Sequence, residues 1–163
     1  MIFGAVNNYV LLVEKLKQQN VELIDVSELK PHEQVNEKRI LEVRESIITE
    51  GLKYPIVVDK ATKIILDGHH RYNILKKLKV SKVPVFFVNY FDERIILDSW
   101  NGAKLTKNDV VKKVNSGELF PQKTTKHMFA SEKGITHISS IIPAINLEIL
   151  KTNAKHVDNK AKV

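Results

Sequence analysis

The sequence predicts an α/β fold, because short apolar runs typical of strands alternate with longer segments whose apolar residues recur at helical spacing. The chain has 163 residues, of which 43% are hydrophobic and 28% are charged, so we expect one domain with its own hydrophobic core. The absence of cysteine excludes disulfides, thiolate metal ligands and cysteine catalysis. We expect a compact domain at residues 21–150, preceded by a helical arm at residues 1–20 and followed by a flexible basic tail at residues 151–163.

The first third of the chain is predicted to form a helix, a strand and a second helix. Apolar residues recur at helical spacing over residues 8–19, and a short apolar run typical of a strand covers residues 21–26. Asn36 is an N-cap residue type in front of an apolar-periodic segment, and Gly51 is typical of a helix end. These signals predict a second helix between the two.

The rest of the chain adds two helices and several short strands. Thr106 and Gly117 mark the start and the end of one helix, and another is expected over residues 69–78. Short apolar runs bounded by turn residues predict strands over residues 55–58, 63–66, 83–88, 94–100 and 136–142.

The most informative segment is the junction between an expected strand and the expected helix at residue 69. It holds an acid, a glycine, two histidines and an arginine, namely Asp67, Gly68, His69, His70 and Arg71. A helix start directs free N–H groups and the positive end of the helix dipole at one point, and arginine can grip phosphate oxygens, so an anion site is predicted. The alternative is that Asp67 only caps the helix and the next three polar residues form its solvated first turn.

Four segments resemble the ParB/sulfiredoxin superfamily: Leu-Lys-Pro-His-Glu at 29–33, the helix at 40–50, Gly-Leu-Lys-Tyr-Pro-Ile-Val-Val-Asp at 51–59 and Asp-Gly-His-His-Arg at 67–71. The last of these is similar to the free-serine kinases of that superfamily, as is Leu-Phe-Pro-Gln-Lys-Thr-Thr-Lys-His at 119–127, with Trp100 between the two. The resemblance implies a ParB/sulfiredoxin-like domain with a small mixed sheet flanked by helices. It also implies a kinase that converts free L-serine to O-phospho-L-serine with ATP or ADP and Mg²⁺.

Phosphoryl transfer needs phosphate positioning, charge neutralisation and a carboxylate that accepts the hydroxyl proton. Glu33, in an irregular segment after Pro31, is the candidate base by its resemblance to the acidic residue that serine kinases use; the alternative is a surface carboxylate near a helix start. Asp67 is the candidate for Mg²⁺ or its water, or for a second proton-handling role. The nucleotide phosphates are assigned to Gly68, His69, His70 and Arg71.

Adjacent residues at a helix start point about 100° apart, so we expect one of His69 and His70 to contact the nucleotide and the other to pack or to orient Asp67. A transition-metal site built on these side chains lacks a third ligand at useful spacing.

A second polar cluster follows Pro121. Hydroxyls and consecutive N–H groups in a turn can hold a phosphate, and Lys123 and Lys126 supply positive charge. The resemblance implies that Thr124, Thr125, Lys126 and His127 bind the transferred phosphate or the product, and the alternative is a plain basic loop. Trp100 is either a wall of the substrate pocket or a core aromatic at a strand end. His32 is expected to be a surface imidazole.

The formal charge of +7 leaves a rival function open. A ParB-like nucleic-acid-binding or nuclease module would use such charge, although we find no helix-turn-helix and no interleaved aromatic and basic patch. A nucleotide sensor without turnover would keep the phosphate site and not need Glu33. No apolar run approaches the ~20 residues that span a bilayer, and no secretion signal is visible, so a cytoplasmic location without membrane contact is expected.

Overall fold

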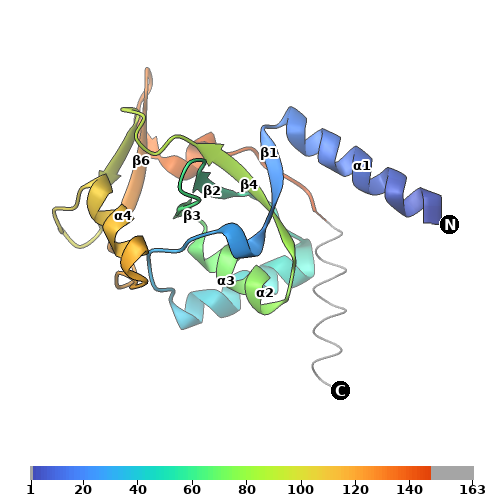
Figure 1. Cartoon of the computed structure of the whole chain (residues 1–163), viewed down its shortest axis with the longest axis horizontal. Coiled ribbons are helices and arrows are strands. Elements are labelled where there is room, and N and C mark those ends of the chain that lie inside the picture. The colour runs from blue at the N-terminus through green and yellow to red at the C-terminus, as the bar shows by residue number, and fades with distance from the viewer. Residues whose placement is uncertain (1, 148–163) are drawn as a thin grey trace.

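The computed structural model describes residues 2–147 and confirms the α/β fold (Figure 1). Its helices are α1 (Ile2–Gln18), α2 (Glu37–Glu50), α3 (His69–Lys77) and α4 (Lys107–Ser116). Its strands are β1 (Val21–Asp25), β2 (Ile56–Asp59), β3 (Ile65–Asp67), β4 (Lys82–Val88), β5 (Ile95–Asp98), β6 (Lys126–Ser131) and β7 (Gly134–His137). Two short 3₁₀ helices cover Val26–Glu28 and Ile138–Ile141.

A mixed four-stranded sheet forms the centre of the molecule, in the order β1-β4-β2-β3. Strand β4 runs antiparallel to β1 and parallel to β2, and β2 runs antiparallel to β3. The parallel pair needs a crossover connection, which here contains β3 and α3. Helices α2 and α3 lie together below the sheet in Figure 1, which agrees with the expected small mixed sheet flanked by helices.

The central sheet is buried on both faces, and its strands divide their side chains between two hydrophobic clusters. Ile56 and Val58 of β2 pack in one cluster with residues of α1, α2 and α3, whereas Val57 packs in the other with Tyr90 and Val110. Alternate residues of a strand point to opposite faces, so continuous apolar runs such as 56–58 are what a doubly covered sheet requires. The strand ends that carry the polar residues are therefore rigidly placed.

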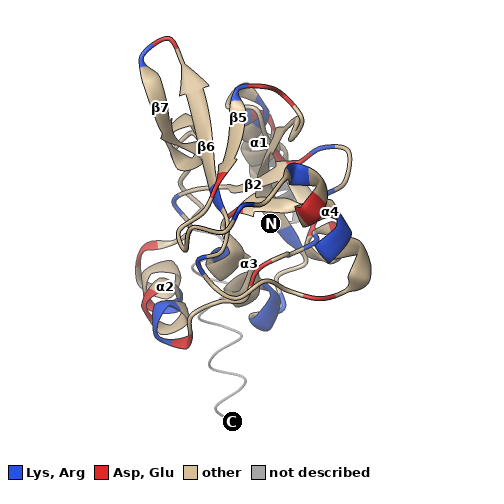
Figure 2. Cartoon of the chain, turned by 90° about the vertical axis from the view of Figure 1, so that its left-hand side faces the viewer, with Lys and Arg blue, Asp and Glu red and all other residues tan. Residues whose placement is uncertain are grey.

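A second, three-stranded antiparallel sheet in the order β5-β6-β7 covers one side of the molecule (Figure 2). The sequence predicts a strand over residues 136–142 and none over residues 126–131, and the structure differs on both points. The structure instead starts β6 at Lys126, ends β7 at His137 and continues in a 3₁₀ helix. Most of β7 is exposed, so its sequence lacks the apolar alternation that marks a half-buried strand.

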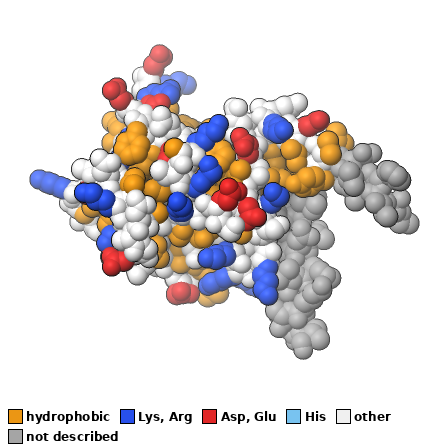
Figure 3. Space-filling view, in the orientation of Figure 1, with side chains coloured by type: hydrophobic (Ala, Val, Ile, Leu, Met, Phe, Trp, Pro, Cys, Tyr) orange, Lys and Arg blue, Asp and Glu red, His pale blue; other side chains and the backbone are white. Residues whose placement is uncertain are grey.

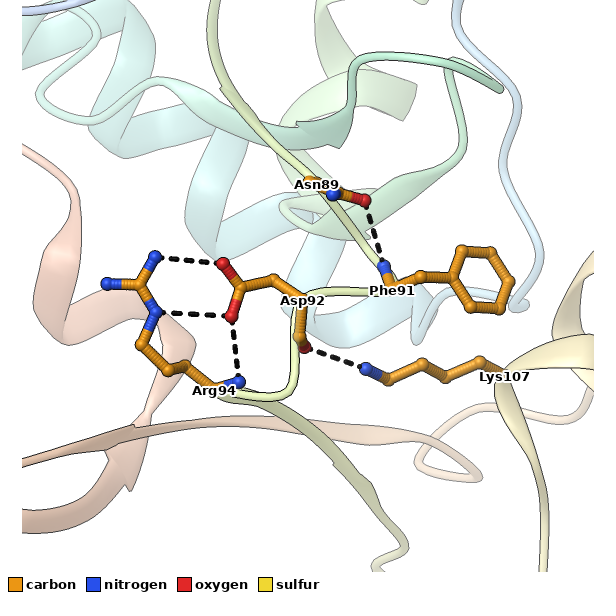
Figure 4. Close-up of polar contacts among 5 residues, drawn as sticks. All are labelled: Asn89, Phe91, Asp92, Arg94 and Lys107. Atoms are coloured by element: carbon orange, nitrogen blue, oxygen red, sulfur yellow. Dashed lines mark hydrogen bonds and ion pairs between the residues drawn. The ribbon is translucent and has the colours of Figure 1, made fainter.

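A group of hydrogen bonds centred on Asp92 fixes the connection between β4 and β5 and joins it to the start of α4 (Figure 4). Arg94 donates from Nε and Nη2 to the Asp92 carboxylate at 3.1 and 2.8 Å, and Lys107 Nζ donates to the Asp92 carbonyl oxygen at 3.1 Å. The hydrogen bonds from Arg94 lower the pKa of Asp92 to about 2. The hydrogen bond from Lys107 holds the start of α4 beside the connection that leads into β5.

Helix α1 extends away from the central sheet in Figure 1, and Leu16 near its C-terminal end is buried in the core. The expected helical arm is thus helical, and it begins earlier than residue 8. The expected tail at residues 151–163 lies outside the described residues. Between residues 2 and 147, no helix combines the length and the apolar character needed to cross a membrane.

Candidate active site

A cavity of about 530 Å³ lies between α2, the start of α3 and the segment that enters β6. It gathers most of the residues that the sequence singled out, although they come from four separate stretches of the chain. Those that line it are Glu33, Asp67, Gly68, His69, His70, Arg71, Trp100, Lys123, Thr125 and His127. Thr124 and Lys126 are not among the lining residues.

The start of α3 has the properties of an anion site. Gly68 is its N-cap residue with φ +102°, and no side chain caps the helix, so the first N–H groups are open to the cavity. The alternative in which Asp67 caps this helix is therefore wrong. A Cβ on Gly68 would stand 2.8 Å from Arg71 Nη2, which shows how closely the arginine side chain packs over this backbone.

Asp67 is paired with Arg71 rather than oriented by a histidine. Arg71 Nη2 donates to Asp67 Oδ2 at 3.3 Å and to the Pro55 carbonyl oxygen at 3.2 Å. The Arg71 Nε atom is buried and has no hydrogen-bond partner among the described residues. The guanidinium is thus fixed at the edge of the anion site through Nη2, and its Nε–H is not used by any described residue. A phosphate-binding arginine needs such uncommitted N–H groups.

Both histidines at the start of α3 hold the segment that carries Glu33. His69 Nε2 accepts from the backbone N–H of His32 at 3.1 Å, and His70 Nε2 accepts from the backbone N–H of Asn36 at 3.2 Å. Burial lowers the pKa of His69 well below its usual value and also lowers that of His70, which keeps both rings neutral and able to accept. The two bonds bracket Glu33 and fix its segment against the anion site.

Glu33 bridges this segment to the polar cluster before β6. Its Oε1 accepts from the Lys123 backbone N–H at 2.7 Å, and its Oε2 accepts from the Thr125 N–H at 3.0 Å and the Thr125 hydroxyl at 2.7 Å. A carboxylate offers about four lone-pair positions, so the three bonds leave one for a further donor. Glu33 is therefore not the loosely held surface carboxylate of the alternative interpretation.

His32 was expected at the surface, and this expectation is wrong. The residue is 0% exposed, and its ring Nε2 lies 2.9 Å from Thr125 Oγ1. Burial lowers the pKa of His32 to about 4. No sequence pattern indicates this burial, because a histidine between a proline and a glutamate in an irregular segment has no periodic neighbours that would reveal it.

The side chains of the polar cluster at residues 123–127 have different hydrogen-bond partners. The Thr124 hydroxyl donates to the Pro121 carbonyl oxygen at 2.6 Å, which closes the turn and leaves Thr124 buried. The buried His127 ring shares a hydrogen bond of 2.9 Å with the Tyr90 hydroxyl, and burial lowers the pKa of His127 to about 3. The cluster is a built turn leading into a strand rather than a plain basic loop.

Trp100 lines the cavity and is 56% exposed, so it is not a core aromatic. The Lys126 ammonium lies 4.2 Å from the centre of the Trp100 ring, a cation–π distance that fixes the two side chains relative to each other. The tryptophan thus forms an open wall of the cavity.

The sequence analysis missed one wall of the cavity. Side chains of α2 and of the segment after it line that wall, namely Arg39, Glu42, Val43, Ser46, Ile47, Leu52, Lys53 and Tyr54. Helical periodicity cannot separate the part of an apolar face that packs in the core from the part that borders a cavity, so the sequence does not reveal that Val43 and Ile47 line it.

No group of three or more histidine, aspartate or glutamate side chains in the described part of the chain is arranged to hold a metal ion.

Residues 11–99 match the ParB N-terminal domain family, and the chain belongs to that family. Among curated proteins it is 40% identical over 86 residues to an ATP-dependent L-serine kinase of Staphylothermus marinus, a match that covers 50% of this chain and 34% of the relative. It is 30% identical over 109 residues to the ADP-dependent L-serine kinase SerK of Thermococcus kodakarensis, covering 63% of this chain and 45% of the relative. The matches span between a third and a half of the length of these relatives.

Among solved structures, a free serine kinase in complex with AMP superposes with a TM-score of 0.65 at 17% identity, covering 80% of this chain and 93% of that one. At this identity the likeness shows a shared fold. It confirms that the expected ParB-like domain architecture is present.

Proposed function

We propose that this protein transfers a phosphoryl group from ATP or ADP to the hydroxyl of free L-serine, with O-phospho-L-serine as the product. The observation that carries the proposal is that one cavity holds a carboxylate, Glu33, facing an uncapped helix start with an arginine beside it. The identity to relatives named as L-serine kinases supports the choice of acceptor.

In the proposed reaction, the nucleotide phosphates bind at the N–H groups of α3 with Arg71 beside them. Serine lies between Glu33 and the wall formed by Trp100, with the Lys123 charge at the rim of the cavity. Glu33 accepts the hydroxyl proton as the phosphoryl group moves across, using the lone pair that the Thr125 and Lys123 bonds leave free.

Magnesium fits this cavity in the way that Mg²⁺ usually binds, through one or two carboxylates together with substrate phosphates. Asp67 is the carboxylate that lies next to the helix start, so Asp67 would hold the ion directly or through a water. When bound, Mg²⁺ neutralises charge on the phosphates. The pairing of Asp67 with Arg71 keeps the carboxylate in place for that role.

The test is to incubate the purified protein with Mg²⁺, free L-serine and either ATP or ADP, and to detect O-phosphoserine by mass spectrometry. We expect product with one of the donors, and that result names the nucleotide. Glu33→Gln should lower the rate by about 10²–10⁴-fold, the range for loss of a general base.

Glu132→Gln is the matched control, because Glu132 is an exposed glutamate in the turn between β6 and β7 and does not line the cavity. It should retain wild-type activity. Nucleotide binding without product from either donor would favour a sensor. Binding of DNA or RNA whose affinity falls steeply with salt would favour a nucleic-acid module.

A further inference from the structure

The hydrogen bonds around Glu33 continue inward to a buried histidine. Thr125 Oγ1 lies 2.7 Å from Glu33 Oε2 and 2.9 Å from His32 Nε2. A hydroxyl has one proton to donate, and an ionised carboxylate can only accept. The Thr125 proton therefore points at Glu33, and His32 must donate from Nε2–H to the threonine oxygen.

The other ring nitrogen of His32 shows what this arrangement costs. His32 Nδ1 is buried and makes no hydrogen bond of standard geometry among the described residues, although the Ile65 backbone interacts with the ring and raises its pKa against the larger effect of burial. A buried ring nitrogen without a well-formed hydrogen bond is unfavourable, and an apolar side chain of similar size would avoid it. The well-formed side-chain hydrogen bond of the ring is the one that joins Nε2 and Thr125.

The His32 ring has little freedom to turn. Its backbone N–H donates to His69 Nε2 at 3.1 Å, and its carbonyl oxygen accepts from the Phe120 N–H at 2.8 Å. The ring packs edge-on against His69 and His127 with centroid distances of 4.6 and 5.7 Å. Its Nε2–H is therefore aimed at one oxygen, Thr125 Oγ1.

We propose that His32 is a positioning residue for the base: by donating from Nε2 to Thr125 Oγ1, it fixes the Thr125 hydroxyl on Glu33 Oε2 and so directs the free lone pair of Glu33 into the cavity. The inference rests on the proposed phosphoryl transfer. It assigns His32 no contact with the nucleotide or with serine. Without this donor, the Thr125 hydroxyl is free to rotate away from Glu33, and the carboxylate then keeps only its two hydrogen bonds from the backbone N–H groups of Lys123 and Thr125.

Two substitutions separate this role from simple packing. His32→Gln keeps an N–H donor at nearly the reach of Nε2, and His32→Phe keeps a ring of similar shape without any donor. In the phosphoserine assay, His32→Phe should lower kcat by about 10–100-fold, as expected for a displaced catalytic group. We expect KM for the nucleotide to stay within about twofold, since the start of α3 is unchanged, and His32→Gln to regain most of the lost kcat.

Full kcat in His32→Phe, or an equal loss in both variants, would overturn the proposal. A measurement that is independent of activity and of the variants is the ¹⁵N spectrum of the imidazole rings in the wild-type protein. We expect the neutral Nε2–H tautomer for His32, and the Nδ1–H tautomer would overturn the proposal whatever the kinetics.

The two proposals fail in different ways. Wild-type protein that makes no phosphoserine contradicts the proposed function, and the ring spectrum then still decides whether His32 orients Thr125. Wild-type protein that makes phosphoserine and loses nothing in His32→Phe contradicts only the positioning role.

Discussion

Gly68 joins the end of β3 to the start of α3 in a backbone conformation that residues with a side chain rarely adopt, with φ +102°. Two consequences follow from the missing Cβ. The chain can turn into the helix without strain, and the Arg71 guanidinium can pack over the same backbone that is expected to hold phosphate. A single residue thus shapes both the helix start and the place of the arginine.

Gly68→Ala should therefore cost more than backbone strain. We expect a loss of unfolding free energy of about 1–2 kcal/mol from the left-handed conformation. We also expect nucleotide binding to weaken by about tenfold or more, because the new Cβ displaces Arg71 and its charge-assisted bonds. Urea unfolding and nucleotide titration measure the two effects.

Gly134→Ala is the control for this substitution. Gly134 is the first residue of β7 and has φ +119°, and a Cβ there would meet nothing within 4 Å. It should lose similar stability and bind nucleotide like the wild type. Equal binding by both variants would contradict the role given to Arg71.

Helix α4 shows how a local signal in the sequence becomes a stable element. Thr106 Oγ1 accepts from the Asp109 N–H at 3.1 Å, and the Asp109 carboxylate accepts from the Thr106 N–H at 2.8 Å. This reciprocal capping satisfies two N–H groups that the helix itself cannot use. Those hydrogen bonds lower the pKa of Asp109, with the Thr106 N–H as the main cause.

Thr106→Ala removes the cap and should lower the unfolding free energy by about 0.5–2 kcal/mol, measured by urea or thermal unfolding. The matched control is Thr49→Ala. Thr49 lies in the last turn of α2, and its hydroxyl donates within its own helix, to the carbonyl oxygens of Glu45 at 2.8 Å and Ser46 at 3.5 Å. Alanine there should change stability by less than about 0.5 kcal/mol. Equal losses in the two variants would contradict the capping role.

At the scale of the whole molecule, burial of histidines makes folding sensitive to acid. The pKa of His32 is lowered to about 4 and that of His127 to about 3, both mainly by burial, from an ordinary value of 6.5. Below pH 6.5 the unfolded chain binds protons at these rings while the folded chain does not. The stability that they confer is therefore complete above pH 6.5 and is lost as the pH falls through 4 and 3.

Unfolding at pH 5 should accordingly bind about two protons at these two rings, in addition to those bound at His69 and His70, whose pKa values burial also lowers. The total uptake is measured as the pH dependence of the urea-unfolding free energy between pH 7.5 and 5. His32→Gln lacks one of the rings and should take up about one proton fewer. A free energy that does not change over this range would contradict the burial of neutral rings.

On the face seen in Figure 3, basic and acidic side chains are interspersed. A duplex-binding surface usually shows one continuous basic stripe. This view therefore gives the nucleic-acid alternative no added support.

Local sequence patterns predicted much of the fold. Asn36 and Thr106 marked helix starts, Gly51 and Gly117 marked helix ends, and the apolar runs marked the strands of the central sheet. The exceptions were β6, which is mostly half-buried, and β7, which is mostly exposed; β6 pairs with both β5 and β7. Pairing between strands leaves little periodic trace when neither face is fully buried.

The sequence by itself determined the residue types of the candidate site: a carboxylate after a proline, a glycine and an arginine at a helix start, and a threonine pair in a polar segment after Pro121. Tertiary structure alone decided which of these meet. Glu33 reaches Thr125 across 92 positions of the chain, and His32 lies between them because the fold buries it. Local patterns encode local backbone preferences, whereas contacts between distant segments depend on how the two hydrophobic clusters bring the strand ends together.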